Sequence, residues 1–286
     1  MTGLSLALPR AASLSGALMA GGDDPPTPAE VDAVRAGLAD ELSALAVVLP
    51  PGERLRLDAY RFTLALHGPQ RLAGADEPFA FSPRTCRRAV GLAAVARCLG
   101  RPSLAPAQAV ADILTAGVRE VTVVPRVSGL PWWAPCYEAL DRGGRATVEA
   151  EAVTWATQLW TALSWDDLAR PVVGGADDRW ACPGGALTLR GHADVRVRPS
   201  GPPALLVLGS GSPPATWRDL LGFPALVAAL AGGPAAAPGR VIGLWPASGQ
   251  VRILPAEATV LTDTAEAVVA AAAAWVDHRG RRRQAA

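Results

Sequence analysis

Residues 187–197 alternate apolar and polar side chains, which is the pattern of a half-buried β-strand. The next apolar run, 204–208, is continuous and ends in Gly209-Ser210-Gly211, as expected of a buried strand that runs into a turn. The two runs place a β-sheet in the C-terminal half of the chain. An acid, Asp194, lies on the first of these strands, three residues after Gly191.

The N-terminal half shows helical periodicity instead. After Thr27-Pro28-Ala29-Glu30, which has the residues of a capped helix start, large apolar residues recur every three or four positions up to Leu49. Further helices are predicted over 83–99, 106–116, 147–163, 216–230 and 262–278, and further strands over 118–127, 171–173, 240–245 and 250–254. Residues 174–185 read as a Gly/Asp turn region, and 55–66 fits a strand or a helix.

These elements predict an α/β protein in which a helical N-terminal portion precedes an α/β core. We expect a flexible leader over 1–26, a helical region over 27–117, the α/β core over 118–278 and a basic tail over 279–286.

The amino-acid composition excludes sites that depend on lysine. All 27 basic residues are Arg, and the chain has no Lys and no Asn, as expected of a GC-rich genome. Schiff-base and P-loop lysines are therefore excluded. The net charge of +1 gives no overall attraction to nucleic acid. We see no apolar run of about 18 residues and no secretory signal, so we expect a cytoplasmic protein without membrane contact.

The four cysteines, Cys86, Cys98, Cys136 and Cys182, are widely separated and form no C-x-x-C pair. This spacing favours buried free thiols over a zinc or iron–sulfur site.

A local excess of positive charge lies between Arg84 and Arg126, where seven Arg face two acids, an excess of five (7 − 2). Arg84 and Arg88 are four residues apart on a predicted helix, so they share a face with Arg87 beside them. These three arginines are our candidates for contacts to a phosphate backbone. The alternative, which we favour, is that these arginines lie on a solvated helix face and bind no ligand.

The predicted order of helix, three strands, helix and strand over about 147–278 resembles the core of the PD-(D/E)XK nuclease superfamily. In particular it resembles the exonuclease-like branch attached to recombination helicases. Gly191-His192-Ala193-Asp194 is similar to the G-x-x-D strand motif of that family. The resemblance gives Glu149 the place of an acid on the preceding helix, and gives 240–254 the place of the closing strands.

Glu149 and Asp194 would be the metal ligands that this resemblance implies, with Mg²⁺ or Mn²⁺ as the ion. On a helical wheel Glu149 falls inside the apolar face of 147–163, where a carboxylate is costly unless it is paired or metal-bound. Alternatively, Glu149 lies near the helix N-terminus and is stabilised by the helix dipole.

The family pattern is incomplete in the second strand, which in that family carries an acid and, two residues on, a Lys. Here the strand is Leu205-Leu206-Val207-Leu208 and has neither. Asp219 and Arg218 on the next helix are the candidates for migrated replacements. For Asp194 the alternative role is an ion pair with Arg190 or Arg196.

Three functions follow as hypotheses. The leading one is a catalytically inactive nuclease-like domain, without a cofactor, that binds DNA or a protein partner in a DNA-processing complex. The second is an active metal-dependent nuclease with a migrated site of Glu149, Asp194 and Asp219. The third is a protein–protein interaction module without nucleic acid.

Overall fold

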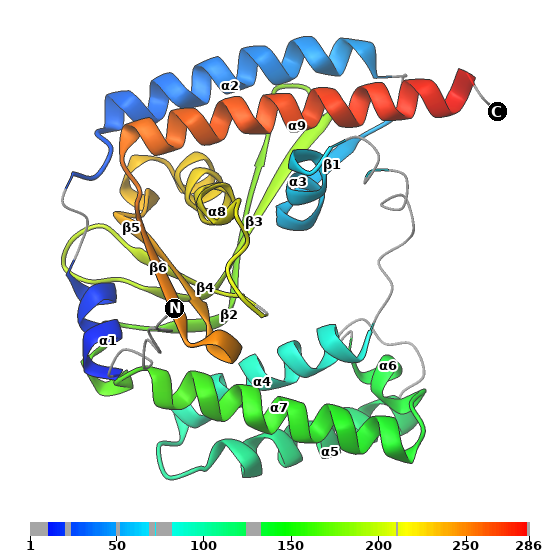
Figure 1. The fold of residues 1–286 in the computed structure, drawn as a ribbon, viewed down its shortest axis with the longest axis vertical. Helices are drawn as coiled ribbons and strands as arrows, with labels where there is room; N and C mark the ends of the chain where they lie inside the picture. The colour runs from blue at the N-terminus through cyan, green and yellow to red at the C-terminus, as the bar shows by residue number, and fades with distance from the viewer. Residues whose placement is uncertain are drawn as a thin grey trace, which may run out of the picture. The chain divides into compact units, whose positions relative to one another are not determined.

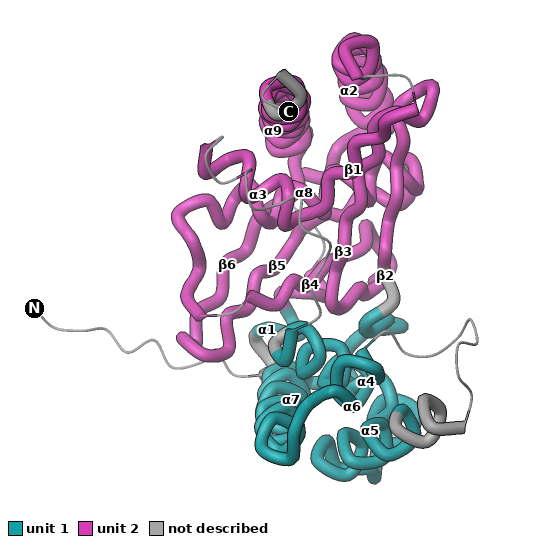
Figure 2. The backbone as a smooth tube through the Cα atoms, turned by 90° about the vertical axis from the view of Figure 1, so that its right-hand side faces the viewer, with its two compact units in different colours: residues 1–16, 79–175 teal, residues 17–78, 176–286 magenta. Residues whose placement is uncertain are grey.

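The computed structural model describes residues 11–20, 24–49, 52–68, 72, 82–123, 133–209 and 211–284. The chain divides into two compact units, each made of two separate stretches: residues 1–16 with 79–175, and residues 17–78 with 176–286 (Figure 2). We call them the first and second unit. Two of the three boundaries fall inside helix α1 (Ala11–Met19) and strand β2 (Val172–Ala181), and the third lies between residues 78 and 79, so none is at the expected position between 117 and 118.

The first unit is helical in its described part. It contains α4 (Pro83–Gly100), α5 (Pro106–Val123), α6 (Ala134–Glu138) and α7 (Arg142–Ala162). Helices α4, α5 and α7 pack against one another. At Gly91 of α4 an added Cβ atom would lie 2.7 Å from the Trp155 ring of α7, so the close packing of these helices needs glycine.

Two predictions fail in this unit. Residues 118–123 continue α5 and do not form a strand, because the helical periodicity of the preceding residues outweighs the β-branched composition; 124–127 lie outside the described residues. Helix α7 begins at Arg142 and not near 147, because the Asp141 side chain accepts a hydrogen bond from the Gly144 N–H and caps an earlier first turn.

The second unit contains a mixed six-stranded sheet, as far as the described residues show, with the order β1-β3-β4-β5-β6 and with β2 paired to β3. The bounds are β1 Leu55–Asp58, β3 Leu187–Val197, β4 Ala204–Leu208, β5 Arg240–Trp245 and β6 Gln250–Pro255. Strand β3 pairs with β1 in parallel through 187–190 and with β4 in antiparallel through 195–197. Strand β4 is parallel to β5, which is antiparallel to β6.

One face of this sheet is covered by helices (Figure 1). They are α2 (Pro28–Val48), α3 (Ala59–Leu66), α8 (Trp217–Gly232) and α9 (Ala258–Gln284). A continuous apolar core joins them to the sheet, and Phe62 of α3 stacks on Phe223 of α8 with ring centroids 4.8 Å apart. Short 3-10 helices lie at Trp165–Asp167, Pro234–Ala236 and Pro246–Ser248.

The α/β class is confirmed, and the element order after α7 follows the prediction: β2, β3, β4, α8, β5. Two features depart from the expected core. Helix α7 belongs to the first unit, whereas the sheet lies mainly in the second. The ambiguous segment 55–66 is half strand and half helix, and its strand β1 joins the sheet, so the N-terminal region is part of the core.

Three further expectations were wrong in detail. The leader contains helix α1, and α9 continues through the expected basic tail to Gln284. Most of the expected turn region 174–185 belongs to the ten-residue strand β2, and only its last residues form the turn. Residues Ala258–Arg281 of α9 are long and apolar enough to cross a membrane by length and composition, a weak signal that core helices of soluble proteins share. Here α9 packs against α2, α3 and α8.

Candidate functional site on strand β3

Asp194 is completely buried. Its Oδ2 atom accepts a hydrogen bond from the backbone N–H of Leu208, at 2.7 Å, where β4 ends. Its Oδ1 atom lies 3.5 Å from Nε2 of His192. The carboxylate is thus turned toward the neighbouring strand and the imidazole, and it completes the hydrogen bonding of a buried backbone group.

Strand β3 carries an irregularity at this residue. Ala193 belongs to the helix-side core, and so does Leu205, whose partner in β3 is Arg196. Directly opposite residues in paired strands point to the same face, so Arg196 lies on the same face as Leu205 and therefore as Ala193. In a regular strand, residues three positions apart point to opposite faces, so the alternation of β3 is interrupted between Ala193 and Arg196. Residues 193–195 are also buried in succession. We conclude that β3 has a β-bulge between Ala193 and Arg196, the segment in which Asp194 accepts the Leu208 N–H.

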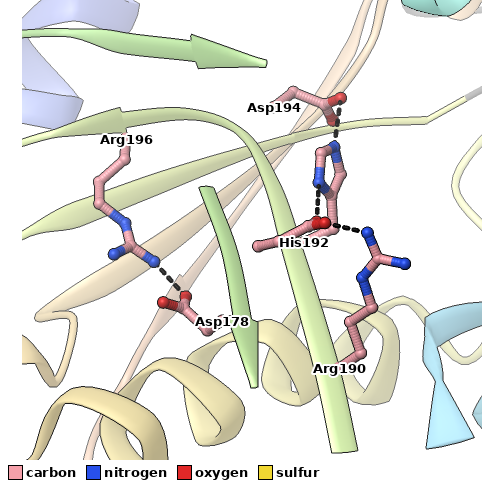
Figure 3. Close-up of polar contacts among 6 residues, drawn as sticks. Asp178, Arg190, His192, Asp194 and Arg196 are labelled. Carbon is pink, nitrogen blue, oxygen red and sulfur yellow. Dashed lines mark hydrogen bonds and ion pairs between the residues drawn. The ribbon is translucent and has the colours of Figure 1, made fainter. Parts of the chain in front are cut away.

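His192 lies between two carboxylates. Its Nδ1 atom is 3.0 Å from Oδ1 of Asp177 on β2, and its Nε2 atom faces Asp194 (Figure 3). A neutral imidazole carries one N–H and can donate to one of these acids, whereas the doubly protonated ring donates to both. The three side chains Asp194, His192 and Asp177 thus form a chain of polar contacts from the buried Asp194 to Asp177, whose side chain is 33% exposed.

Asp177 also forms an ion pair with Arg190. Burial alone would raise the pKa of Asp177, but the hydrogen bonds and charges of Arg190 and His192 outweigh it and hold the pKa below its usual value. A second pair, Asp178 with Arg196, lies farther along β3 (Figure 3). The two arginines considered as partners for Asp194 are therefore paired with the acids of β2.

Gly191 has a packing role. A Cβ atom there would lie 2.9 Å from Cβ of Val227 and 3.4 Å from Cα of Pro224, both on α8. Glycine therefore allows α8 to lie close against β3. Gly191, His192 and Asp194 each have a contact within the fold and Ala193 is buried in the core, so the motif does not require a metal to explain it.

Glu149 does not have the buried position that the helical wheel suggested. It is exposed on α7, whereas Val148 and Ala152 beside it are buried. The buried residues of α7, namely Val148, Ala152, Ala156 and Leu159, form a narrower face than the one deduced from 147–163, and Glu149 lies outside it. Burial first, and then the charge of Glu149, raise the pKa of Tyr137, so this acid lies near the phenol.

The described residues do not fit a divalent metal ion. Asp219 lies in the first turn of α8, where the helix dipole favours an acid. Strand β4 has no acid, and no group of three or more His, Cys, Asp and Glu side chains in the described part of the chain could hold a metal. Mg²⁺ is usually held by one or two carboxylates together with waters and substrate phosphates, so the use of Asp194 by the Leu208 N–H and the exposed position of Glu149 also count against a site here.

The arginines predicted to contact phosphate lie on α4. Arg87 forms an ion pair with Glu151 of α7, which neutralises its charge locally. Arg88 is partly buried, and the side chain of Arg84 lies outside the described residues. The buried free thiols were expected correctly for Cys86, Cys98 and Cys182, while Cys136 is partly exposed.

Sequence reasoning missed Asp177, Asp178 and the bridging position of His192. The only signal in the sequence is that two acids precede Arg190, His192 and Arg196 by a length that suits a hairpin. It identifies the partners only once residues 172–181 are known to form a strand beside β3.

Comparison with known proteins adds no relative to this picture: no protein-family model, curated protein or solved structure matches the chain.

Proposed function

We propose that this chain is a non-catalytic, nuclease-like component that binds nucleic acid or a protein partner within a nucleic-acid-processing assembly. The observation that carries the proposal is the state of Asp194. Its carboxylate is buried, accepts the Leu208 N–H and lies beside His192, so it is used within the fold. The adjacent strand β4 offers no acid to complete a metal site.

The element order from α7 to β5, and the Gly191–Asp194 motif, support the nuclease-like part of the proposal. Fold similarity alone does not carry an activity, because function resides in the side chains of a site. The active-nuclease alternative requires Glu149, Asp194 and Asp219 to act together. Their described surroundings favour it less, since Asp194 is engaged in the sheet and Glu149 is exposed near Tyr137.

The test combines cleavage with binding. Purified protein is incubated with labelled single- and double-stranded DNA and Mg²⁺ or Mn²⁺, beside the isosteric variant Asp194→Asn. We expect no cleavage by either protein, together with salt-sensitive binding by both. Cleavage by the wild-type protein that Asp194→Asn abolishes would overturn the non-catalytic assignment.

Absence of binding to either nucleic acid, with no cleavage, would leave the third function. In that case the chain would be a protein–protein interaction module.

A further inference from the structure

A cluster of arginines from two distant segments meets at the C-terminal end of α9. Nη1 of Arg279 donates to the backbone oxygen of Arg54 at 3.3 Å, and Nη1 of Arg61 donates to the backbone oxygen of Arg56 at 2.9 Å. Nε1 of Trp275 on α9 donates to the backbone oxygen of Arg61 at 3.2 Å, which ties α3 to α9. We call the group of Arg54, Arg56, Arg61, Arg279 and Arg281 the arginine surface.

Positive charge gathers at this surface. Residues 52–61 and 277–284 together contain seven Arg against Glu53, Asp58 and Asp277, an excess of four (7 − 3), although the whole chain has a net charge of only +1. The basic stretch 84–126 has an excess of five (7 − 2), but there Arg87 is paired with Glu151 and Arg88 is partly buried.

Two of the three acids in these segments, Glu53 and Asp58, are engaged within the cluster. Oε2 of Glu53 lies 3.7 Å from Nη1 of Arg279, and Oδ1 of Asp58 accepts the Arg61 backbone N–H at the start of α3. Arg54, Arg56 and Arg281 are exposed. The dipole of α9 favours cations at its end, but it gives no reason for the arginines of the segment 54–61, which lie outside that helix.

An exposed aromatic ring accompanies the arginines. Tyr60, next to Arg61 at the start of α3, is 65% exposed, whereas a tyrosine is usually partly buried with only its hydroxyl end in water. Guanidinium groups bind phosphate oxygens through paired hydrogen bonds, and an exposed aromatic ring stacks on an unpaired base. This combination matches a single strand more closely than a duplex, whose bases are already stacked.

We propose that the arginine surface and Tyr60 bind single-stranded nucleic acid, through its phosphates and one stacked base. This rests on the proposed function and specifies its contact surface, which lies in the second unit and not on α4. An anionic membrane is the competing partner for a basic surface, and the experiment separates the two.

Binding of a fluorescein-labelled oligothymidine is measured by anisotropy over a series of salt concentrations. The test variant is Arg54→Gln/Arg56→Gln. Its matched control is Arg179→Gln/Arg198→Gln, which removes the same charge from exposed arginines of the same unit. All four side chains are exposed, and circular dichroism checks that each variant folds.

The test variant should bind more weakly than the wild-type protein. Its plot of log affinity against log salt should be shallower by about 1.4, since each phosphate contact on a single strand contributes about 0.7 to the slope. The control should match the wild-type slope. Tyr60→Ala should weaken binding by about 5- to 150-fold, while Tyr60→Phe, which keeps the ring, should bind like wild type.

The outcomes separate this inference from the proposed function. If the wild-type protein binds and the test variant behaves like its control, the arginine surface is refuted while nucleic-acid association stands. If the wild-type protein binds no oligonucleotide, the arginine surface is refuted, and of the proposed function only binding to a protein partner remains. Binding to phosphatidylserine vesicles without binding to oligothymidine would assign the surface to a membrane and overturn the proposal.

Discussion

Replacing Asp194 tests whether its carboxylate serves the fold or a metal. In Asp194→Ala the N–H of Leu208 loses its acceptor in a fully buried position. An unsatisfied buried donor costs about 1–3 kcal/mol, and a hydrogen bond to a charged group contributes about 1.5–3 kcal/mol. Both values are estimates of the same Asp194–Leu208 hydrogen bond and are therefore not added. We expect the free energy of unfolding of Asp194→Ala to be lower than that of wild type by about 2–3 kcal/mol.

Two further variants should lose less stability than Asp194→Ala. Asp194→Asn keeps an oxygen for the Leu208 N–H and should lose less than the alanine variant. Asp219→Ala is the matched control, because it removes an acid from the first turn of α8, where the dipole interaction contributes only about 0.3–1 kcal/mol.

Urea unfolding with EDTA present measures all three variants, and amide hydrogen exchange at Leu208 reports the local bond. A carboxylate in an empty metal site faces like charges, so its removal would leave stability unchanged or increase it. An Asp194→Ala protein as stable as wild type, with Leu208 exchange unchanged, would therefore refute the structural role.

Three further predictions concern other parts of the fold. The pKa of Asp177 is lowered in the folded state, so the contribution of Asp177 to stability is present above its ordinary pKa and is lost as pH falls through the lowered pKa. The destabilisation caused by Asp177→Asn, measured by thermal unfolding, should therefore shrink in acid. A constant difference from wild type down to the lowest pH would contradict this. Burial raises the pKa of the Cys86 thiol to about 11. Under native conditions at pH 8 a thiol reagent should therefore modify Cys136 and leave Cys86 intact until urea is added. Equal modification rates at the two cysteines would contradict this. Gly243→Ala should lower stability by about 1–3 kcal/mol, because the new methyl group would lie 2.4 Å from the Trp245 ring, and an unchanged urea midpoint would contradict it.

Most helices could be predicted from the sequence, because their signals are local. Ser82 with Thr85 and Thr27 with Glu30 form capping boxes where polar residues precede an apolar periodicity. The alternation in 187–197 likewise predicted a strand, since one face of β3 is buried.

Strand β2 could not be predicted in the same way. Gly174, Asp177 and Asp178 are residues typical of turns, and their strand conformation is stabilised by ion pairs with Arg190 and Arg196, which lie on another strand. Pairing across strands is a tertiary property that a scan of local propensity does not contain.

The candidate site was predicted only in part. The sequence indicated Asp194 as the acid to examine, but its hydrogen bond with the Leu208 N–H lies in a bulged segment of β3 that the alternating pattern does not show. Glu149 was misplaced because the buried face of α7 is narrower than its apolar pattern suggested, and the width of that face is set by the helices packed against it.

Titration of the wild-type protein and Asp194→Asn with Mn²⁺ by isothermal calorimetry tests the central claim most directly. We predict no heat of specific binding for either protein and no rise in melting temperature at millimolar Mn²⁺, because a ligand that does not bind the native state cannot stabilise it. Stoichiometric binding by the wild-type protein that Asp194→Asn abolishes would show that Asp194 is a metal ligand and would contradict the account.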